Sequence, residues 1–234
     1  MRFCHKKVFM LNHRLLRISL ILAILSILFS ASAAMAIEEP KYTVLEKSTP
    51  FELREYVPLI LAEVEVAGDM DDASSQGFRL IAAYIFGKNQ AKNKMNMTAP
   101  VTIESKDTNL SQRIAMTAPV TIQESKQTKP NEPASNKNLW IVSFVMPSEY
   151  TLADLPQPLD DRVHIRELPA EKKAAITFSG RYSEEKVLEK TQELQAWMKT
   201  RQLKEASDPQ FARYNPPWTL PFFRRNEVLI RVSD

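Results

Sequence analysis

Few side chains in this sequence could bind a transition metal. Of the three histidines and one cysteine, only His164 lies beyond the first 13 residues. Imidazole is the commonest metal ligand in proteins, so His164 is the first candidate for a metal ligand. The thioether sulfurs of Met95, Met97 and Met116 and the phenolate of Tyr84 are further candidate metal ligands.

Each of these candidates also has a purely structural interpretation. His164 alternates with Val163 and Ile165 and shares its strand face with Arg162 and Arg166. Successive side chains of a strand point to opposite faces, so this pattern favours a histidine that faces solvent. Methionine more often fills irregular space in a core, and a tyrosine near a helix end more often packs with its hydroxyl in water.

The first 36 residues have the order of parts that an export signal requires. A basic start without acids precedes an apolar run from Ile18 to Phe29, and small residues follow. We predict a signal peptide at 1–36, cleaved after Ala36, and a chain that is periplasmic in a bacterium and secreted otherwise. The alternative is an uncleaved anchor, because residues 18–37 carry no charge and are long enough to span a bilayer.

Removal of this signal changes which partners and sites the composition supports. The chain has 31 basic and 28 acidic residues; five of the bases and none of the acids lie in 1–36, which leaves 26 against 28. The basic balance therefore belongs to the signal, and we predict no nucleic-acid partner. We also predict no stable membrane insertion after cleavage. With one histidine and no cysteine left, a disulfide framework and a multi-histidine or cysteine metal site are excluded. The four glycines exclude a glycine-rich phosphate loop.

Apolar alternation predicts strands in two groups, separated by a polar stretch. Residues 123–138 lack any strong hydrophobe and are predicted to be a mobile loop within a single domain at 37–234. The segment Met97–Ile103 recurs as Met116–Ile122, and we predict that both are strands with Val101, Ile103, Val120 and Ile122 pointing inward. The other predicted strands are 42–45, 51–57, 59–66, 140–146, 162–168, 173–179, 211–214 and 227–232.

One helix is predicted in each half of the domain. Asp71 and Asp72 suit a helix start, and the apolar stripe that follows ends near Gly87. Ser183 can cap the second helix, with two acids in its first turn. The first stripe consists of Phe78, Ile81, Ala82 and Ile85, and the second of Val187, Thr191, Leu194 and Met198. Strands, one helix and strands in each half predict an α+β fold, a pseudo-two-fold sheet or distorted β-barrel with two helices.

Several segments of this sequence resemble the SOUL haem-binding-protein family. They are Ala83–Asn89, Lys94–Val101, Ala175–Gly180, Ala212–Pro221 and Arg224–Val228. The resemblance runs from about Lys41 to Val232, and the Met-Thr-x-Pro-Val and Tyr-Asn-Pro-Pro-x-Thr segments make it specific together. It implies a barrel-like sheet with two helices and an apolar groove near the first helix that binds haem or another porphyrin.

A groove near the first helix would bring Phe78, Arg79, Ala82 and Ile85 to the porphyrin. The family's motifs do not fix the ligand of the iron, and His164 and Met97 are the candidates that we draw from the residues themselves. The small side chains at 82 and 83 would leave room for a flat macrocycle. Basic residues along this helix could meet haem propionates in some relatives, but here Arg79 is its only cation before Lys88. The alternative for this stripe is that its side chains simply form the core.

Three functional hypotheses follow from these observations. The first is an exported tetrapyrrole-binding protein that carries or buffers haem without catalysis. The second is a structural or partner-binding envelope domain that binds no haem. The third, an enzyme on the same fold, ranks last because no nucleophile with its base and no paired carboxylates stand in a recognisable arrangement.

Overall fold

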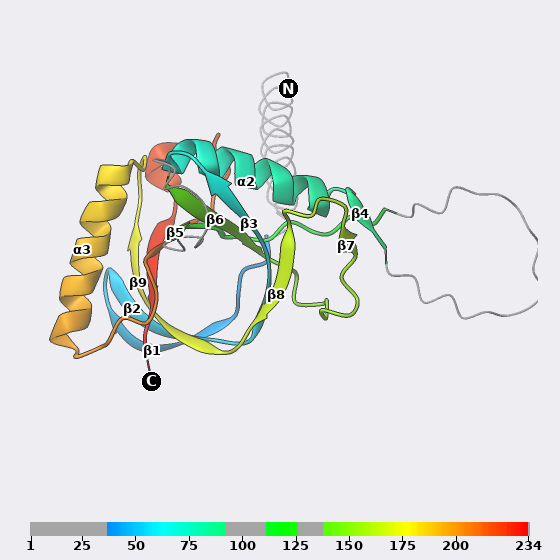
Figure 1. Cartoon of the computed structure of the whole chain (residues 1–234). Coiled ribbons are helices and arrows are strands. Elements are labelled where there is room, and N and C mark those ends of the chain that lie inside the picture. The colour runs from blue at the N-terminus through cyan, green and yellow to red at the C-terminus, as the bar shows by residue number, and fades with distance from the viewer. Residues whose placement is uncertain (1–36, 92–110, 126–137, 234) are drawn as a thin grey trace, which may run out of the picture. The chain divides into compact units, whose positions relative to one another are not determined.

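The computed structural model describes residues 37–91, 111–125 and 138–233. Residues 38–234 form one compact unit, dominated by a nine-stranded antiparallel sheet (Figure 1). The strands of this sheet are β1 (Tyr42–Ser48), β2 (Phe51–Tyr56), β3 (Leu59–Ala67), β5 (Val120–Ser125), β6 (Leu139–Val145), β8 (His164–Leu168), β9 (Glu171–Phe178), β10 (Gln210–Arg213) and β11 (Asn226–Arg231). The short strands β4 (Asn89–Gln90) and β7 (Gln157–Pro158) pair separately. The helices are α2 (Met70–Ile85), α3 (Glu184–Thr200) and the 3-10 turn η1 (Pro221–Phe223).

The sheet consists of two halves with the same internal order. In one half β8, β3, β6 and β5 are neighbours, and in the other β2, β9, β11 and β10 are neighbours. The halves meet where β5 pairs with β10, and β1 is an additional edge strand. α2 follows β3, and α3 follows β9. This arrangement confirms the predicted α+β fold with two helices on a pseudo-two-fold, barrel-like sheet.

Each half of the sheet contains one strand whose neighbour in the sequence lies in the other half. β2 directly precedes β3 in the sequence but pairs with β9, on the far side of the sheet. β8 directly precedes β9 but pairs with β3. The two halves are therefore interlocked by an exchange of strands.

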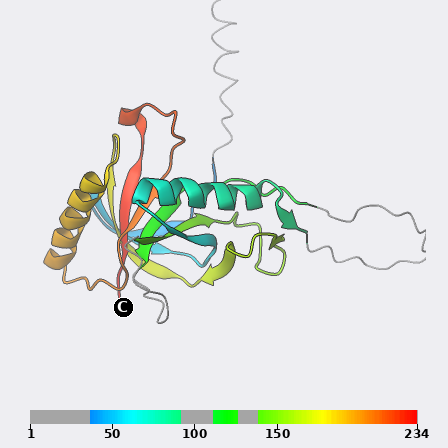
Figure 2. The same cartoon turned by 45° about the horizontal axis from the view of Figure 1, so that its top comes forward.

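One row of apolar side chains crosses the sheet and lies on a single face. Side chains directly opposite each other on antiparallel strands share a face. By register the row contains Val64, Val142, Ile122, Phe211, Val228, Ile176 and Phe51. The half of this row from Val64 to Phe211 packs with α2, and the half from Val228 to Phe51 packs with α3. Both helices therefore lie on the same, outer face of the curled sheet, as Figures 1 and 2 show.

Local signals fix where the two helices begin and end. The Asp69 carboxylate accepts a hydrogen bond from the backbone N–H of Asp72 at the start of α2, and Gly87 takes a positive φ of 119° just after its end. Ser183 caps α3 in the same way, by accepting from the N–H of Lys186. Such caps satisfy N–H groups that have no partner within the helix. Within the described ranges, neither helix combines the length and apolarity needed to cross a membrane.

The structure differs from the sequence prediction at some positions. Residues 123–125 were expected in the loop but belong to β5, which extends to Ser125. Of the predicted α2 stripe, Ile81, Ala82 and Ile85 are buried, whereas Phe78 stays partly exposed. The inward positions predicted at Val101 and Ile103, and the remainder of the predicted loop at 126–137, lie outside the described residues.

The close approach of α2 to the sheet depends on a glycine. A Cβ atom at Gly77 would lie 2.5 Å from Cγ2 of Val142. We therefore expect Gly77→Ala to lower the free energy of unfolding by about 1–3 kcal/mol through overpacking, although alanine favours a helix by about 1 kcal/mol over glycine. Chemical denaturation measures this difference. In a Val142→Ala background the loss caused by Gly77→Ala should be smaller, because the clashing methyl groups are absent. Ser75→Ala on the exposed side of α2 is the matched control. A Gly77→Ala variant as stable as the wild type would contradict the close packing.

Candidate functional site

An apolar surface is exposed along one side of α2. Phe78, Ala82 and Phe86 follow each other at intervals of four residues, so they lie on one side of the helix. Phe78 is 37% and Phe86 is 53% exposed, whereas Ala82 between them is 8% exposed. With a rise of about 1.5 Å per residue, the two phenylalanines are separated by about 12 Å along the helix. We call these three residues, together with Arg113, the α2 flank.

Contacts with the rest of the fold hold this surface in place. The Phe78 ring packs at 5.4 Å from the fully buried ring of Phe144. At the other end, the backbone N–H of Ile114 donates to the carbonyl of Ile85 at 2.9 Å, which fixes this segment beside the helix end. The neighbouring Arg113 places its guanidinium 5.9 Å from the centre of the Phe86 ring. The flank therefore combines residues from two segments that are distant in the sequence.

The α2 flank has the chemistry to hold a flat aromatic molecule that carries acids. Two aromatic rings with an alanine between them offer a shelf on which an apolar ring can pack. Arg113 lies at the Phe86 end of this shelf, and the exposed Arg79 follows Phe78 on α2. Arginine pairs readily with carboxylates, so the border suits the acidic substituents of such a molecule.

The structure distributes the predicted helix residues over different environments. Phe78 and Ala82 lie on the flank, and Arg79 is exposed beside it. Ile85 has no exposed surface, so it belongs to the core and a ligand cannot reach it while α2 keeps its packing. Met97 lies outside the described residues.

Two residues of the flank were missed by the sequence reasoning. Phe86 could have been found, because it continues the spacing of Phe78 and Ala82 by one more turn. Arg113 has no such signal in the sequence, since its place beside Phe86 depends on how the segment around Ile114 packs against α2.

The structure places His164 away from the α2 flank. His164 lies on the edge strand β8, directly opposite Glu63 of β3, and is exposed. Glu63 points to the opposite face from Ala62 and Val64, which pack with α2. His164 therefore lies on the other face of the sheet and does not meet the helix residues predicted with it. Across the described ranges, no three histidine, cysteine or acidic side chains gather as a metal site would require.

Tyr84 and Met116, and the two arginines before β11, are engaged with the rest of the fold. The buried Tyr84 hydroxyl donates to the Pro156 carbonyl at 2.9 Å, and burial raises the pKa of this tyrosine. Met116 is partly buried against the α2 core. Arg224 donates to backbone carbonyls of its own loop, and Arg225 pairs with Glu39 at 2.6 Å. Tyr84, Arg224 and Arg225 thus use their polar groups within the fold.

The inner face of the sheet contains a buried ion pair. Arg54 of β2 donates to both carboxylate oxygens of Glu227 of β11, at 2.7 and 3.0 Å. Tyr214 and Thr177 donate to the same carboxylate at 2.7 and 3.1 Å. Both charged side chains are almost fully buried, and a buried charge needs such partners. The Glu227 carboxylate thus makes its hydrogen bonds within the protein and is not available to bind a ligand.

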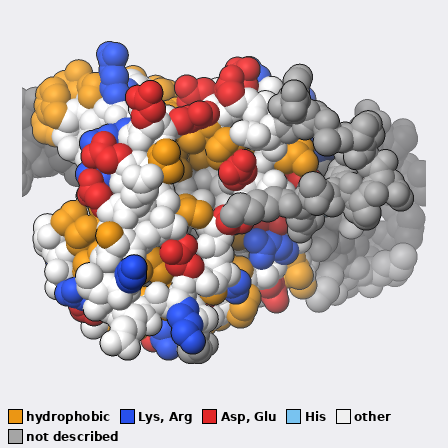
Figure 3. Space-filling view, turned by 60° about the vertical axis from the view of Figure 1, so that its left-hand side comes forward, with side chains coloured by type: hydrophobic (Ala, Val, Ile, Leu, Met, Phe, Trp, Pro, Cys, Tyr) orange, Lys and Arg blue, Asp and Glu red, His pale blue; other side chains and the backbone are white. Residues whose placement is uncertain are grey.

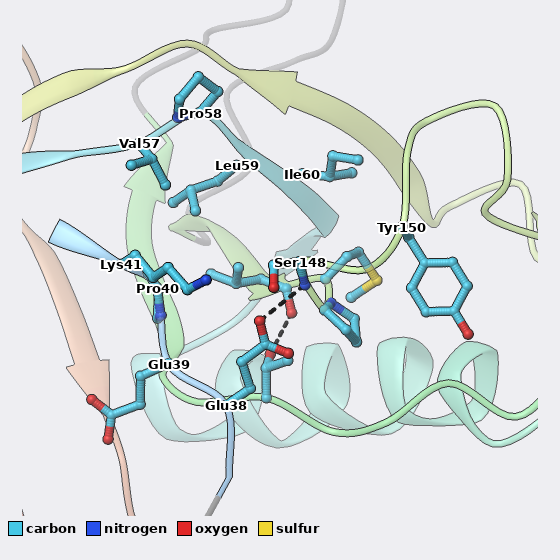
Figure 4. Close-up of a pocket in the computed structure, with 14 residues that line it drawn as sticks. Glu38, Glu39, Pro40, Lys41, Val57, Pro58, Leu59, Ile60, Ser148 and Tyr150 are labelled. Atoms are coloured by element: carbon cyan, nitrogen blue, oxygen red, sulfur yellow. Dashed lines mark hydrogen bonds between the residues drawn. The ribbon is translucent and has the colours of Figure 1, made fainter.

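A small pocket opens between the segment before β1, the start of β3 and the end of β6 (Figure 4). Its volume is about 110 Å³, below the roughly 300–1,000 Å³ of small-molecule sites. The Glu38 carboxylate in it accepts from the backbone N–H of Ser148 at 3.0 Å, and hydrogen bonds from Ser148 lower the pKa of Glu38. This pocket cannot enclose a macrocycle.

Comparison with known proteins identifies the family of this chain. The sequence model described as SOUL heme-binding protein matches residues 37–231. The chain belongs to the SOUL family. This SOUL chain is 28% identical to heme-binding protein 2 of Homo sapiens over 141 residues, which cover 58% of this chain and 57% of the human protein. It is also 28% identical to heme-binding protein 1 of Xenopus tropicalis over 179 residues, which cover 76% of this chain and 81% of that protein.

A solved structure shares the fold of this SOUL domain. The C-terminal domain of EcmrR superposes with a TM-score of 0.52 at 11% identity, covering 82% of this chain and 98% of that domain. At this identity the likeness concerns the fold alone. The alignment supports the barrel-like arrangement with two helices described above.

The buried tyrosines of the inner face predict how stability changes with alkaline pH. Burial raises the pKa of Tyr56 to about 12, against the opposing effect of Arg54. Tyr56 therefore stabilises the fold fully below pH 10, the usual tyrosine value, and this contribution is lost as the pH rises from 10 to about 12. Denaturation of the wild type should show a loss of about 1.4 kcal/mol per pH unit for each such group.

The variant Tyr56→Phe isolates this contribution. Its free energy of unfolding should fall less steeply between pH 10 and 12 than that of the wild type. A comparison of both proteins at pH 8 separates the loss of packing and hydrogen bonding from the titration. Identical slopes above pH 10 would contradict the predicted shift.

Proposed function

We propose that this chain is a tetrapyrrole-binding protein that holds haem or a related porphyrin on the α2 flank. Membership of the SOUL heme-binding protein family over residues 37–231 supports this proposal, as do the names of the two relatives. The observation that carries it is the pair of exposed rings, Phe78 and Phe86, on either side of Ala82.

The residues of the flank have distinct roles in this proposal. Phe78 and Phe86 pack against the macrocycle, and Ala82 keeps the space between them open. Arg113 and Arg79 attract the propionates. Haem, when bound, supplies an iron centre that absorbs light and exchanges electrons, whereas the protein supplies an apolar surface and positive charge.

Among the described residues, the flank has no free donor to iron. His164 lies on the other face of the sheet, and the Tyr84 hydroxyl is engaged with Pro156. We infer that contacts with the ring and the propionates provide most of the affinity. A carrier or buffer needs reversible binding of this kind rather than a reactive site. No nucleophile with its base was found in the sequence, which supports a role without catalysis.

Export completes the proposed function. The basic start, the apolar run and the small residues before Ile37 support it. Sequencing the N-terminus of the protein from the cells that make it tests this part. A chain beginning at Ile37 is expected, and one that retains its first residues would instead support the anchor.

Titration of hemin into the protein tests the site. We expect a saturable Soret shift at one equivalent in the wild type. Ala82→Leu fills the space between the rings and Arg113→Glu reverses the charge, so each should weaken binding by about tenfold or more. Leu188→Ser, at an exposed leucine of α3, is the matched control and should bind like the wild type. No saturable shift would reject haem binding and favour the partner-binding hypothesis, whereas unchanged affinity in both variants would reject the flank.

Two further titrations test the absence of an axial ligand at the flank. The variant His164→Ala should give the same Soret position and affinity as the wild type, because residue 164 lies on the opposite face. Metal-free protoporphyrin IX should bind within a few-fold of hemin, since the iron adds little. A shifted Soret band in the variant, or much weaker binding of the metal-free ring, would show that a side chain ligates the iron.

A further inference from the structure

A buried amide joins the end of α2 to the segment that carries Arg113. The side chain of Asn89, on β4, is almost fully buried, since the residue is only 3% exposed. Its nitrogen donates to the carbonyls of Tyr84 and Gln112, both at 2.7 Å. Its oxygen accepts from the backbone N–H of Gln112 at 2.9 Å. One side chain thus connects two backbone segments that are distant in the sequence.

These hydrogen bonds engage groups that the helix itself leaves without partners. The last carbonyls of an α-helix accept no hydrogen bond from within the helix. At the end of α2, the Tyr84 carbonyl accepts from Asn89, and the Ile85 carbonyl accepts from the N–H of Ile114 at 2.9 Å. Asn89 therefore binds the residue before Arg113, and α2 binds the residue after it, so the backbone of Arg113 is fixed from both sides.

The side chain that this arrangement places is the guanidinium of the α2 flank. It lies 5.9 Å from the centre of the Phe86 ring, and Arg113 is exposed. The preceding Gln112 is also held through its own side chain, which donates to the Tyr150 hydroxyl at 3.2 Å. An exposed arginine keeps much of its rotamer freedom, so the position of its charge depends on where its backbone is held.

The balance of charge on the domain makes the position of this arginine important. Residues 37–234 carry 26 basic and 28 acidic side chains. On the face drawn in Figure 3, basic and acidic side chains are mixed. A mixed surface produces no strong field of one sign. A carboxylate is then recognised through an arginine held at a fixed place, where its N–H groups can donate to both carboxylate oxygens.

We propose that Asn89 is the positioning residue of the α2 flank. Its amide holds Arg113 at the Phe86 end of the shelf, where the guanidinium meets an acidic substituent of the bound ring. Asn89 thereby sets the preference of the flank for porphyrins that carry free acids. This role rests on the proposed porphyrin site and adds to it a residue that does not touch the ligand.

Hemin and its dimethyl ester, whose propionates carry no charge, separate this role from a structural one. Asn89→Ala should weaken binding of hemin by about three- to tenfold and change binding of the ester by less than about twofold. A substitution that merely loosened the flank would weaken both ligands equally, and that result would overturn the proposal. Trp140→Phe is the matched control, because it removes a hydrogen bond to the Gly68 carbonyl at the other end of α2. It should bind both ligands like the wild type.

Combining two substitutions tests whether Asn89 acts through the arginine. Arg113→Gln should weaken hemin binding at least as much as Asn89→Ala does. The double variant should bind hemin like Arg113→Gln alone, within about twofold, because residues that act as a unit do not have additive effects. A loss equal to the product of the two single effects would contradict the proposed role.

Hydrogen exchange on the wild type checks the contact without a substitution that could prevent folding. The Gln112 N–H donates to a buried oxygen, so it should exchange about a hundredfold or more slowly than an amide of an unfolded chain. Exchange at the unfolded rate would overturn the assignment, whatever the variants do.

Failure of this proposal and failure of the haem site give different results. A wild type without saturable hemin binding rejects the porphyrin site, and the role of Asn89 falls with it. Saturable binding that Asn89→Ala leaves unchanged rejects the role of Asn89 alone.

Discussion

The apolar row that crosses the sheet from Val64 to Phe51 determines how the rest of the molecule is arranged. A sheet with one continuous apolar face must cover that face, and here the two helices divide it between them. The other face is then free of this requirement and can be polar. The candidate haem site follows from the way α2 covers its part of this face. Phe78 lies at the edge of the covered area, so its ring is partly exposed while it still contacts Phe144 in the core.

The polar inner face depends on a different balance. Glu227 is buried on β11, and three groups satisfy its carboxylate, including the bidentate Arg54. Both charges lose their hydration on burial, so such a pair contributes little net stability. Removing one partner alone, however, leaves a buried charge without a counter-charge and is destabilising. The pair joins β2 to β11 across β9, so its geometry also fixes the position of three strands. A site that serves the sheet in this way is not available to a ligand.

The sequence was sufficient for the parts of the fold that depend on local patterns. Acids at the start of α2, the cap at Ser183 and the alternation in β3 each correspond to an element of the structure. The exposure of His164 also followed from alternation. What alternation could not provide was the register with Glu63, which decides that this histidine and α2 are on opposite faces. The position of Arg113 could not be predicted for the same reason, since it lies beside Phe86 through a tertiary contact. The β5 boundary was misplaced because residues 123–125 are polar. The side chains of Gln123 and Ser125 alternate with Ile122 and lie on the inner face, where polar side chains are accommodated.

The exchange of strands between the two halves has a consequence for the newly made chain. Phe51 of β2 pairs with Ile176 of β9. β2 therefore lacks its partner on this side until most of the polypeptide has been synthesised. β3 likewise lacks one of its two partners until β8 appears. Contacts between such distant residues form slowly, and the half of the sheet that contains β2 cannot close before β9, β10 and β11 have been synthesised. A nascent chain with this topology stays open for longer than one built from local hairpins, which is the condition in which polypeptides pass through narrow translocation pores.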